Sequence, residues 1–419
     1  MLKPKSGRLH AHSMIRRLIG MGSALALFIV SGCSGSLRHD VTAGQSSLDF
    51  ERRVASIRGL ALLQPVPIEV EGVRETGEIA YKNSVRRFSG DRLLDATAVA
   101  HAIGLDEQSF DSKAAMRDQV GAEVAGIYDP EAQRVVLAER DNAGGRRLDD
   151  AERPLLTAHE LAHALQYQHF PVAEGLEAAS ARYDRYLAFN AVLEGDATFT
   201  SLAYVQGRSP DRRMIEAMKA RLRDALWSQP GAPTGEQLLE YGYGTLFVME
   251  AFERGGWVGV NRLYAQPPWS CREITEPELY FRASHRPRAG IVVEGYQGVM
   301  KGWHTVERDT LGIVPLATIL AHGAEDGEQP VSLPLRWSDD QVVALRKGKQ
   351  LAIIWMLSFD DPDSAWAFRQ AYAPLLERAD ENEPHVVSSR GSVVLVAIGE
   401  AARRYQTLGP ALWSSTRFK

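Results

Sequence analysis

The amino-acid sequence predicts an α+β protein, and three patterns carry this prediction. The segment 155–170 is rich in apolar, helix-forming residues and predicts a buried helix. Two short strands are expected at 124–128 and 134–137, joined by a turn at Asp129 and Pro130. From about residue 310 the pattern changes to strand, helix and strand. We therefore expect a larger α+β domain at 50–309 and a small α+β domain at 310–419.

The N-terminus has the pattern of a secretion signal. Arg16 and Arg17 precede an apolar stretch at 18–30, which is shorter than the roughly 20 residues that span a bilayer. The stretch ends in Val-Ser-Gly-Cys, which resembles a bacterial lipobox. We expect residues 1–33 to be a lipoprotein signal with lipid on Cys33. The alternative is an ordinary secretion signal with an incidental cysteine.

A lipid on Cys33 would place the protein in the bacterial cell envelope. Because Ser34 and not an aspartate follows the cysteine, the outer membrane is the expected destination in a cell with two membranes. The residues at 34–49 are mostly small and polar, and we expect them to form a flexible tether. The membrane would then be a partner through the lipid.

The composition indicates a packed globular protein, with 45% hydrophobic and 24% charged residues. A net charge of −5 is mild and argues against a nucleic-acid partner. Besides Cys33 the chain has only Cys271, so no intrachain disulfide can form if Cys33 carries lipid. We expect Cys271 to be a packed residue and not a nucleophile.

The elements of the larger domain begin with a strand at 66–70, followed by the strand pair described above. A loop at 142–145 then leads to Asp149 and Asp150, either of which can cap the helix that contains 155–170.

Helices dominate the second half of the larger domain. The segment 174–206 predicts one long helix, or two helices with a break, and 236–254 predicts another that stops at Gly255 and Gly256. Pro267 and Pro268 mark a loop. The small C-terminal domain is expected to contain a strand, an amphipathic helix and a hairpin, at 351–359, at 363–376, and at 386–389 with 392–398 around Arg390 and Gly391.

The helix at 155–170 contains the motif HExxH, formed by His159, Glu160 and His163. Histidines four residues apart lie on one face of a helix, so both imidazoles can bind one metal ion. Glu160 would lie beside the remaining coordination position and could take a proton from a water molecule held there. The alternative is a charged helix face with two solvated or packed histidines. The apolar neighbours favour a zinc site, because these three groups are costly to bury unless something satisfies them.

A catalytic zinc ion usually has three protein ligands, and two residues could supply the third. His169 lies ten residues after His159, at the third-histidine position of the metzincin pattern HExxHxxGxxH. That pattern needs a glycine to break the helix, and Gln166 stands in its place. An unbroken helix would direct His169 away from the metal.

Glu194 is the favoured third ligand. On a helix it would be flanked by the small residues Ala191, Ala197 and Thr198 and followed by Gly195, so that its helix could press closely against the metal helix. Two histidines and a glutamate are an established catalytic zinc set. Asp196 is a candidate for orienting a histidine N–H behind the ligands.

An HExxH followed by a glutamate on a later helix resembles the gluzincin clan of zinc metallopeptidases. More closely, roughly residues 50–300 resemble a group of uncharacterised bacterial zincin-like secreted proteins and lipoproteins. The matching segments are 57–70, 124–138, 159–170, 192–199, 241–248 and 255–280, of which the HExxH and the EGDA at 194–197 are the specific part. Tyr167 departs from the pattern, since such proteins tend to carry an aspartate there.

The resemblance implies a zincin-like fold, with a small mixed sheet and its edge strand, the HExxH helix and a mainly helical lower half. It also implies peptide hydrolysis with Glu160 as the general base, and no particular substrate. Tyr241 or Tyr243 could stabilise the oxyanion, although core-packing tyrosines are equally expected. The strand at 134–137 would suit the edge strand that pairs with an extended peptide.

Two alternatives to a zinc peptidase stay open. One is a binding or assembly lipoprotein whose metal site is structural or vestigial. The other is a zinc hydrolase of a different amide, such as one in cell-wall peptide.

Overall fold

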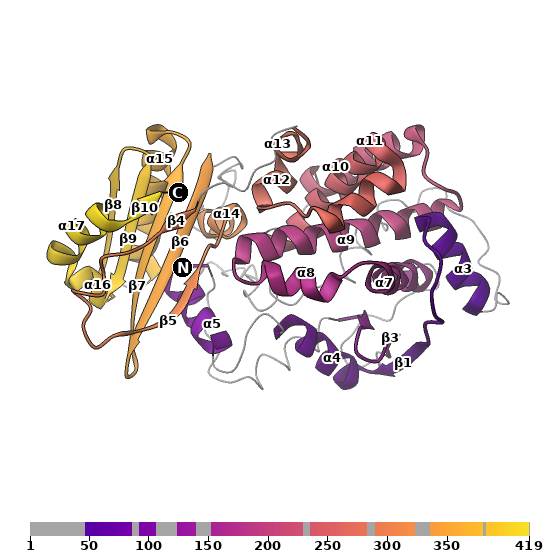
Figure 1. The fold of residues 1–419 in the computed structure, drawn as a ribbon, viewed down its shortest axis with the longest axis horizontal. Coiled ribbons are helices and arrows are strands. Elements are labelled where there is room, and N and C mark those ends of the chain that lie inside the picture. Colours follow the sequence, from indigo (N-terminus) through magenta and orange to yellow (C-terminus); the bar gives the residue numbers. More distant parts are fainter. Residues whose placement is uncertain are drawn as a thin grey trace, which may run out of the picture.

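The computed structural model describes residues 47–85, 92–105, 124–139, 152–228, 235–282, 290–322, 336–379 and 383–418. It has a helical body, a small sheet beneath it and a larger sheet at one end (Figure 1). The predicted α+β class is confirmed. Cys33, the loop at 142–145 and the candidate caps Asp149 and Asp150 lie outside the described residues.

The small sheet is mixed and has the order β1-β3-β2. Strand β1 (Ile68–Gly72) runs parallel to β3 (Arg134–Glu139), and β2 (Gly126–Asp129) runs antiparallel to it. The β2–β3 turn forms because the Asp129 carboxylate accepts the backbone N–H groups of Glu131 and Ala132. The predicted strand pair is therefore confirmed.

The expectation that 134–137 is an edge strand is wrong. β3 is the centre of the sheet, and its backbone is paired on one side with β1 and on the other with β2. The central position of β3 agrees with its sequence, because Val135, Val136 and Leu137 form a continuous apolar run. All three side chains are buried. The edge strand next to the helical body is β2.

The helical body is built around α7 (Glu152–His169) and α9 (Tyr183–Gln206), which pack on each other. The predicted helix at 174–206 is two helices, α8 (Val172–Ala179) and α9, with a break between them. The other helices of the body and its flanks are α3 (Ser47–Arg58), α4 (Val73–Val85), α5 (Arg92–Ala102), α10 (Arg212–Ser228), α12 (Cys271–Thr275) and α13 (Pro277–Phe281).

A π-helical segment, η1 (Leu238–Tyr243), leads directly into α11 (Gly244–Ala265). Gly255 and Gly256 kink α11 where the sequence predicted that it would stop, and Gly256 has φ +59° and ψ −156°, a conformation open in practice only to glycine. The helix then resumes as far as Ala265, so the predicted end at these glycines is wrong.

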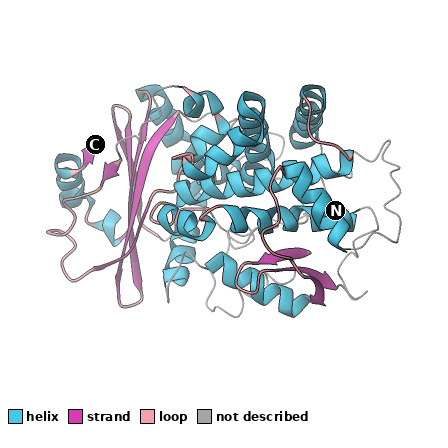
Figure 2. Ribbon diagram, turned by 45° about the vertical axis from the view of Figure 1, so that its right-hand side comes forward, coloured by secondary structure: helices cyan, strands magenta, loops and turns pink. Residues whose placement is uncertain are grey.

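The larger sheet is antiparallel, with the order β5-β6-β7-β9-β8. Both faces are covered, by α14 and α15 on one side and by α16 and α17 on the other (Figures 1 and 2). Burial on both faces explains the unbroken apolar sequence of β7. The bounds are β5 (His304–Asp309), α14 (Ile313–His322), β6 (Trp337–Lys347), β7 (Gln350–Phe359), α15 (Pro362–Ala379), β8 (His385–Arg390), β9 (Val393–Gly399), α16 (Glu400–Arg403) and α17 (Tyr405–Ser415), with a short pair of β4 (Ile291–Val292) and β10 (Arg417–Phe418) beside them.

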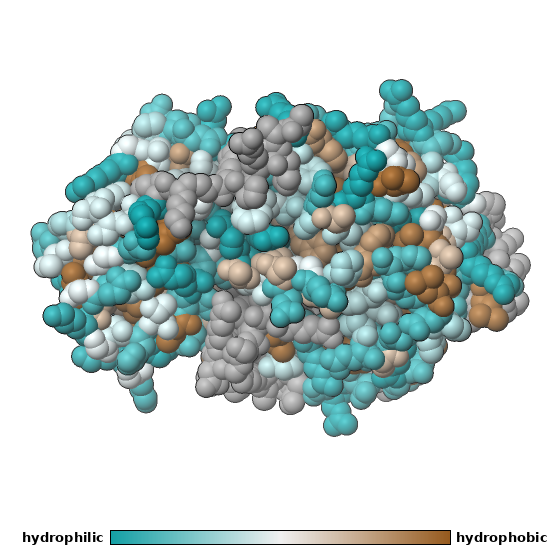
Figure 3. All heavy atoms as spheres, in the orientation of Figure 1, coloured by the Kyte–Doolittle hydropathy of each residue, from teal (hydrophilic) through white to brown (hydrophobic). Residues whose placement is uncertain are grey.

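One hydrophobic cluster runs from α9 and α11 into this sheet, where it includes Trp337 and Trp355. The division into domains at residue 310 stays a prediction. The face drawn in Figure 3 is mostly hydrophilic, with apolar side chains in small patches. Within the described ranges, no helix has the length and apolar character needed to cross a membrane.

Candidate metal centre

The HExxH motif lies in the middle of α7, where the helix is almost completely buried. His159 is 1% exposed and Glu160 is 4% exposed. Leu156 and Leu161 on this helix belong to the apolar cluster shared with the small sheet. The polar groups of the motif are thus fixed inside a core, and each of them needs a partner there.

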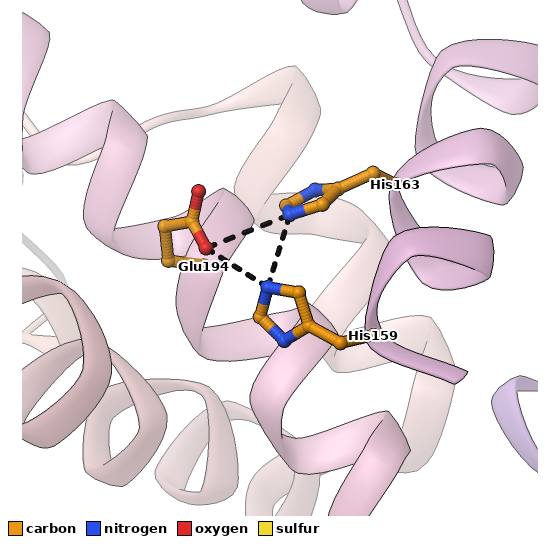
Figure 4. A group of neighbouring side chains, drawn as sticks. All are labelled: His159, His163 and Glu194. Atoms are coloured by element: carbon orange, nitrogen blue, oxygen red, sulfur yellow. Dashed lines mark hydrogen bonds and ion pairs between the residues drawn. The ribbon is translucent and has the colours of Figure 1, made fainter. Parts of the chain in front are cut away.

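Glu194 on α9 is brought to the two histidines (Figure 4). Its Oε2 lies 3.1 Å from His159 Nε2 and 3.5 Å from His163 Nε2, and the two Nε2 atoms are 3.2 Å apart. His163 and Glu194 keep 14% and 15% side-chain exposure. The group is therefore buried on the side of His159 and open to solvent on the other.

These three side chains could hold a metal ion. With zinc–ligand bonds of about 2.0–2.1 Å in a tetrahedral site, neighbouring ligand atoms stand about 3.3 Å apart. The three separations of 3.1, 3.2 and 3.5 Å bracket that value. The donor set of two imidazoles and one carboxylate fits zinc and leaves a fourth position.

The electrostatics of the group favour a positive charge at this point. Burial lowers the pKa of His163, but the Glu194 carboxylate outweighs burial and raises this pKa to about 9. Burial raises the pKa of Glu194, but His163 and His159 outweigh it and hold the pKa far below its usual range. A bound proton or a metal cation would supply this positive charge. Metal binding should therefore displace the proton and release it.

The close backbone approach beside Glu194 is between α9 and the start of α11. A Cβ on Gly195 would lie 2.4 Å from the carbonyl carbon and oxygen of Gly244, and one on Gly244 would lie 2.2 Å from the Ala191 carbonyl oxygen. The small residues therefore let α9 meet the start of α11. For Gly195 the expectation that it faces the metal helix is wrong, although the position of Glu194 is as expected.

Glu160 points to the edge strand of the small sheet. Its Oε2 accepts the backbone N–H of Tyr128 at 2.8 Å. Burial raises the pKa of Glu160, while the neighbouring imidazoles of His159 and His163 oppose that rise. One carboxylate oxygen is thus fixed by β2, and the group is held beside the metal ligands.

The two candidate tyrosines lie in different places. Tyr241, in η1, packs with its ring centroid 6.2 Å from that of His159, and its buried hydroxyl interacts with the Glu194 carboxylate. Burial and the neighbouring Glu194 carboxylate raise the pKa of Tyr241 well above its ordinary value, so it stays a donor. Tyr243 lines a separate depression with Lys219 and Glu250.

His169 lies at the end of α7, away from the other two histidines. Its Nε2 is 2.6 Å from the carbonyl oxygen of Ala61. The helix is unbroken through Gln166, which is why His169 does not turn back to the group. Cys271 is buried and free, and its N–H binds Asp184.

Asp196 does not bind a histidine directly. It forms a buried ion pair with Arg58 of α3, with Nε to Oδ1 at 2.7 Å, and it accepts the hydroxyl of Tyr264 at 2.6 Å. Gln166 stands between Asp196 and His163. No short sequence pattern indicated that Arg58 and Tyr264 contact Asp196. The position of Gln166, three residues after His163 on one helix, was a usable signal for its contact.

No family model, curated protein or solved structure matches this chain in the comparisons.

Proposed function

We propose that the protein is a zinc-dependent peptidase of the gluzincin type. The observation that carries the proposal is the convergence of His159, His163 and Glu194, with Glu160 fixed beside them by Tyr128 N–H. A third ligand from a later helix supports the gluzincin type over the metzincin type. The mixed sheet beneath the HExxH helix and the helical remainder support a zincin-like fold.

When bound, zinc would supply Lewis-acid polarisation of the scissile carbonyl and of water. Glu160 would accept the proton of the attacking water and deliver it to the leaving amine. Its bond to the Tyr128 N–H keeps one oxygen in place and leaves the other for this transfer. The buried Tyr241 hydroxyl, which interacts with the Glu194 carboxylate, is the candidate donor to the developing oxyanion.

Replacement of the general base tests this function. Glu160→Gln should retain zinc and fold and lose at least about 10²-fold in turnover of a random-peptide library, since an amide cannot take up the proton. Glu174→Gln, the same change on an exposed residue of α8, is the matched control. Cleavage by Glu160→Gln at the rate of the control would refute the mechanism.

We further propose that the protein works in the cell envelope as a lipoprotein. The support is the lipobox-like sequence before Cys33. A peptide or protein in that compartment would be the substrate. Metabolic labelling with a fatty-acid analogue should label the wild type and not Cys33→Ser, and equal labelling of both would contradict the anchor.

A further inference from the structure

Gln166 is a buried residue of α7 that contacts both the metal group and the helix carrying Glu194. It is 1% exposed. Its Oε1 lies 2.9 Å from His163 Nδ1, and its Nε2 lies 2.9 Å from the Leu193 carbonyl oxygen and 3.4 Å from Asp196 Oδ2. Every polar atom of this amide therefore faces a defined partner.

The partners of Gln166 fix which way its amide points. The Leu193 carbonyl oxygen can only accept a hydrogen bond, and the Asp196 carboxylate paired with Arg58 is a second acceptor. The NH₂ group must face these two acceptors, because a flipped amide would set its oxygen against the Leu193 oxygen. The Gln166 oxygen consequently faces His163, where it too can only accept.

Arg58 keeps Asp196 an acceptor. The guanidinium contacts both carboxylate oxygens, at 2.7 and 2.9 Å, and is 1% exposed. It also stacks over Trp257 at 4.5 Å and donates to Asn261. Because both carboxylate oxygens of Asp196 accept from this guanidinium, Asp196 faces Gln166 as an acceptor.

We propose that Gln166 is a positioning residue of the metal centre, which holds the His163 proton on Nδ1 and so leaves the Nε2 lone pair facing His159 and Glu194. Asp196 and Arg58 act behind it, by fixing its amide. His159 has no such support, because its Nδ1 is buried without a partner in the part of the chain that the structure describes. The inference rests on the proposed metal site and not on peptide cleavage.

The wild-type protein tests the tautomer directly. The zinc-free protein is measured at a pH high enough for the His163 imidazole to be neutral. A long-range proton–nitrogen spectrum of histidine-labelled protein should then show His163 protonated at Nδ1 and bare at Nε2. The reverse tautomer would overturn the proposal.

Gln166→Met tests the consequence for metal binding. It keeps the length of the side chain and removes both hydrogen-bonding groups. Zinc affinity, measured by competition with a chromophoric chelator, should fall about 10- to 100-fold, as is typical when the partner of a metal-bound histidine is lost. Gln168→Met, the same change where the side chain contacts Leu63 and Gln64, should bind zinc like the wild type.

A merely structural role would give a different result. Gln166→Met would then unfold at a lower temperature, but its zinc affinity and its His163 tautomer would match those of Gln168→Met, and the proposal would be wrong. Neither measurement needs turnover. An active Glu160→Gln would refute the proposed function and leave this inference standing.

Discussion

Gly195 is the position where the packing of the fold and the metal site can be tested together. Helix propensity alone predicts that Gly195→Ala stabilises the protein by about 1 kcal/mol, because glycine is unfavourable inside a helix. The structure predicts the opposite. The new Cβ would lie 2.4 Å from the carbonyl carbon and oxygen of Gly244 and 2.8 Å from the Thr245 nitrogen.

These neighbours are backbone atoms and cannot rotate away. Restoring an ordinary contact of 3.4 Å or more requires α9 and the start of α11 to separate by about 1 Å. Overpacking of this kind costs about 1–3 kcal/mol, and three backbone contacts below 3 Å place Gly195 at the upper end. After the gain in propensity, we expect a net loss of about 2 kcal/mol.

The same shift would displace Glu194, the preceding residue. Metal sites hold their ligand distances to about 0.2 Å, so zinc should bind at least about tenfold more weakly. Denaturant unfolding in a chelator and zinc competition in buffer measure the two effects separately. Gly298→Ala is the control, because its Cβ meets nothing within 4 Å. If Gly195→Ala unfolds and binds zinc like this control, the account of the α9–α11 contact fails.

Three further predictions follow from buried groups. The double variant His159→Ala/His163→Ala should retain no stoichiometric zinc by metal analysis, since Glu194 alone cannot hold it, and a full complement of zinc would contradict the site. Arg58→Met should lower the free energy of unfolding by about 3–5 kcal/mol, because it removes the ion-pair partner of the buried Asp196. Arg53→Met is the control, since Arg53 lies over the Tyr204 ring, and an equal loss in the two variants would contradict the prediction. Burial raises the pKa of Asp184 from 3.8 to about 7, so the unfolded chain ionises at lower pH than the folded protein. The free energy of unfolding should therefore fall by roughly 1.4 kcal/mol per pH unit between about pH 4 and pH 7. Unfolding curves of Asp184→Asn should lack this slope, and an unchanged slope would refute the prediction.

Local signals in the sequence predicted the elements around the metal group and part of the larger sheet, but not α3, α4, α5, α10 or the strands β4 to β6. The HExxH helix, the β2–β3 turn and the hairpin of β8 and β9 each follow from short patterns, whereas the break before α9 was only one of two alternatives. The order of the small sheet did not follow, because the pairing of β1 with β3 joins residues more than sixty positions apart. The apolar run in β3 was the available sign that this strand is central.

The metal group shows the same limit. The two histidines are fixed by helix periodicity, and Glu194 could be selected from its residue type and its place on a later helix. The packing that holds Glu194 in place could not be predicted, since Gly195 faces Gly244 and not α7. Arg58 and Tyr264 reach Asp196 from 138 and 68 residues away, and no short pattern encodes such contacts.

A zinc-edge anomalous difference map from a crystal grown with zinc tests the central claim most directly. We predict one peak per chain, about 2.0–2.2 Å from His159 Nε2, His163 Nε2 and a Glu194 carboxylate oxygen. A peak coordinated by His169 with Glu194 turned away, or no peak between α7 and α9, would contradict the account.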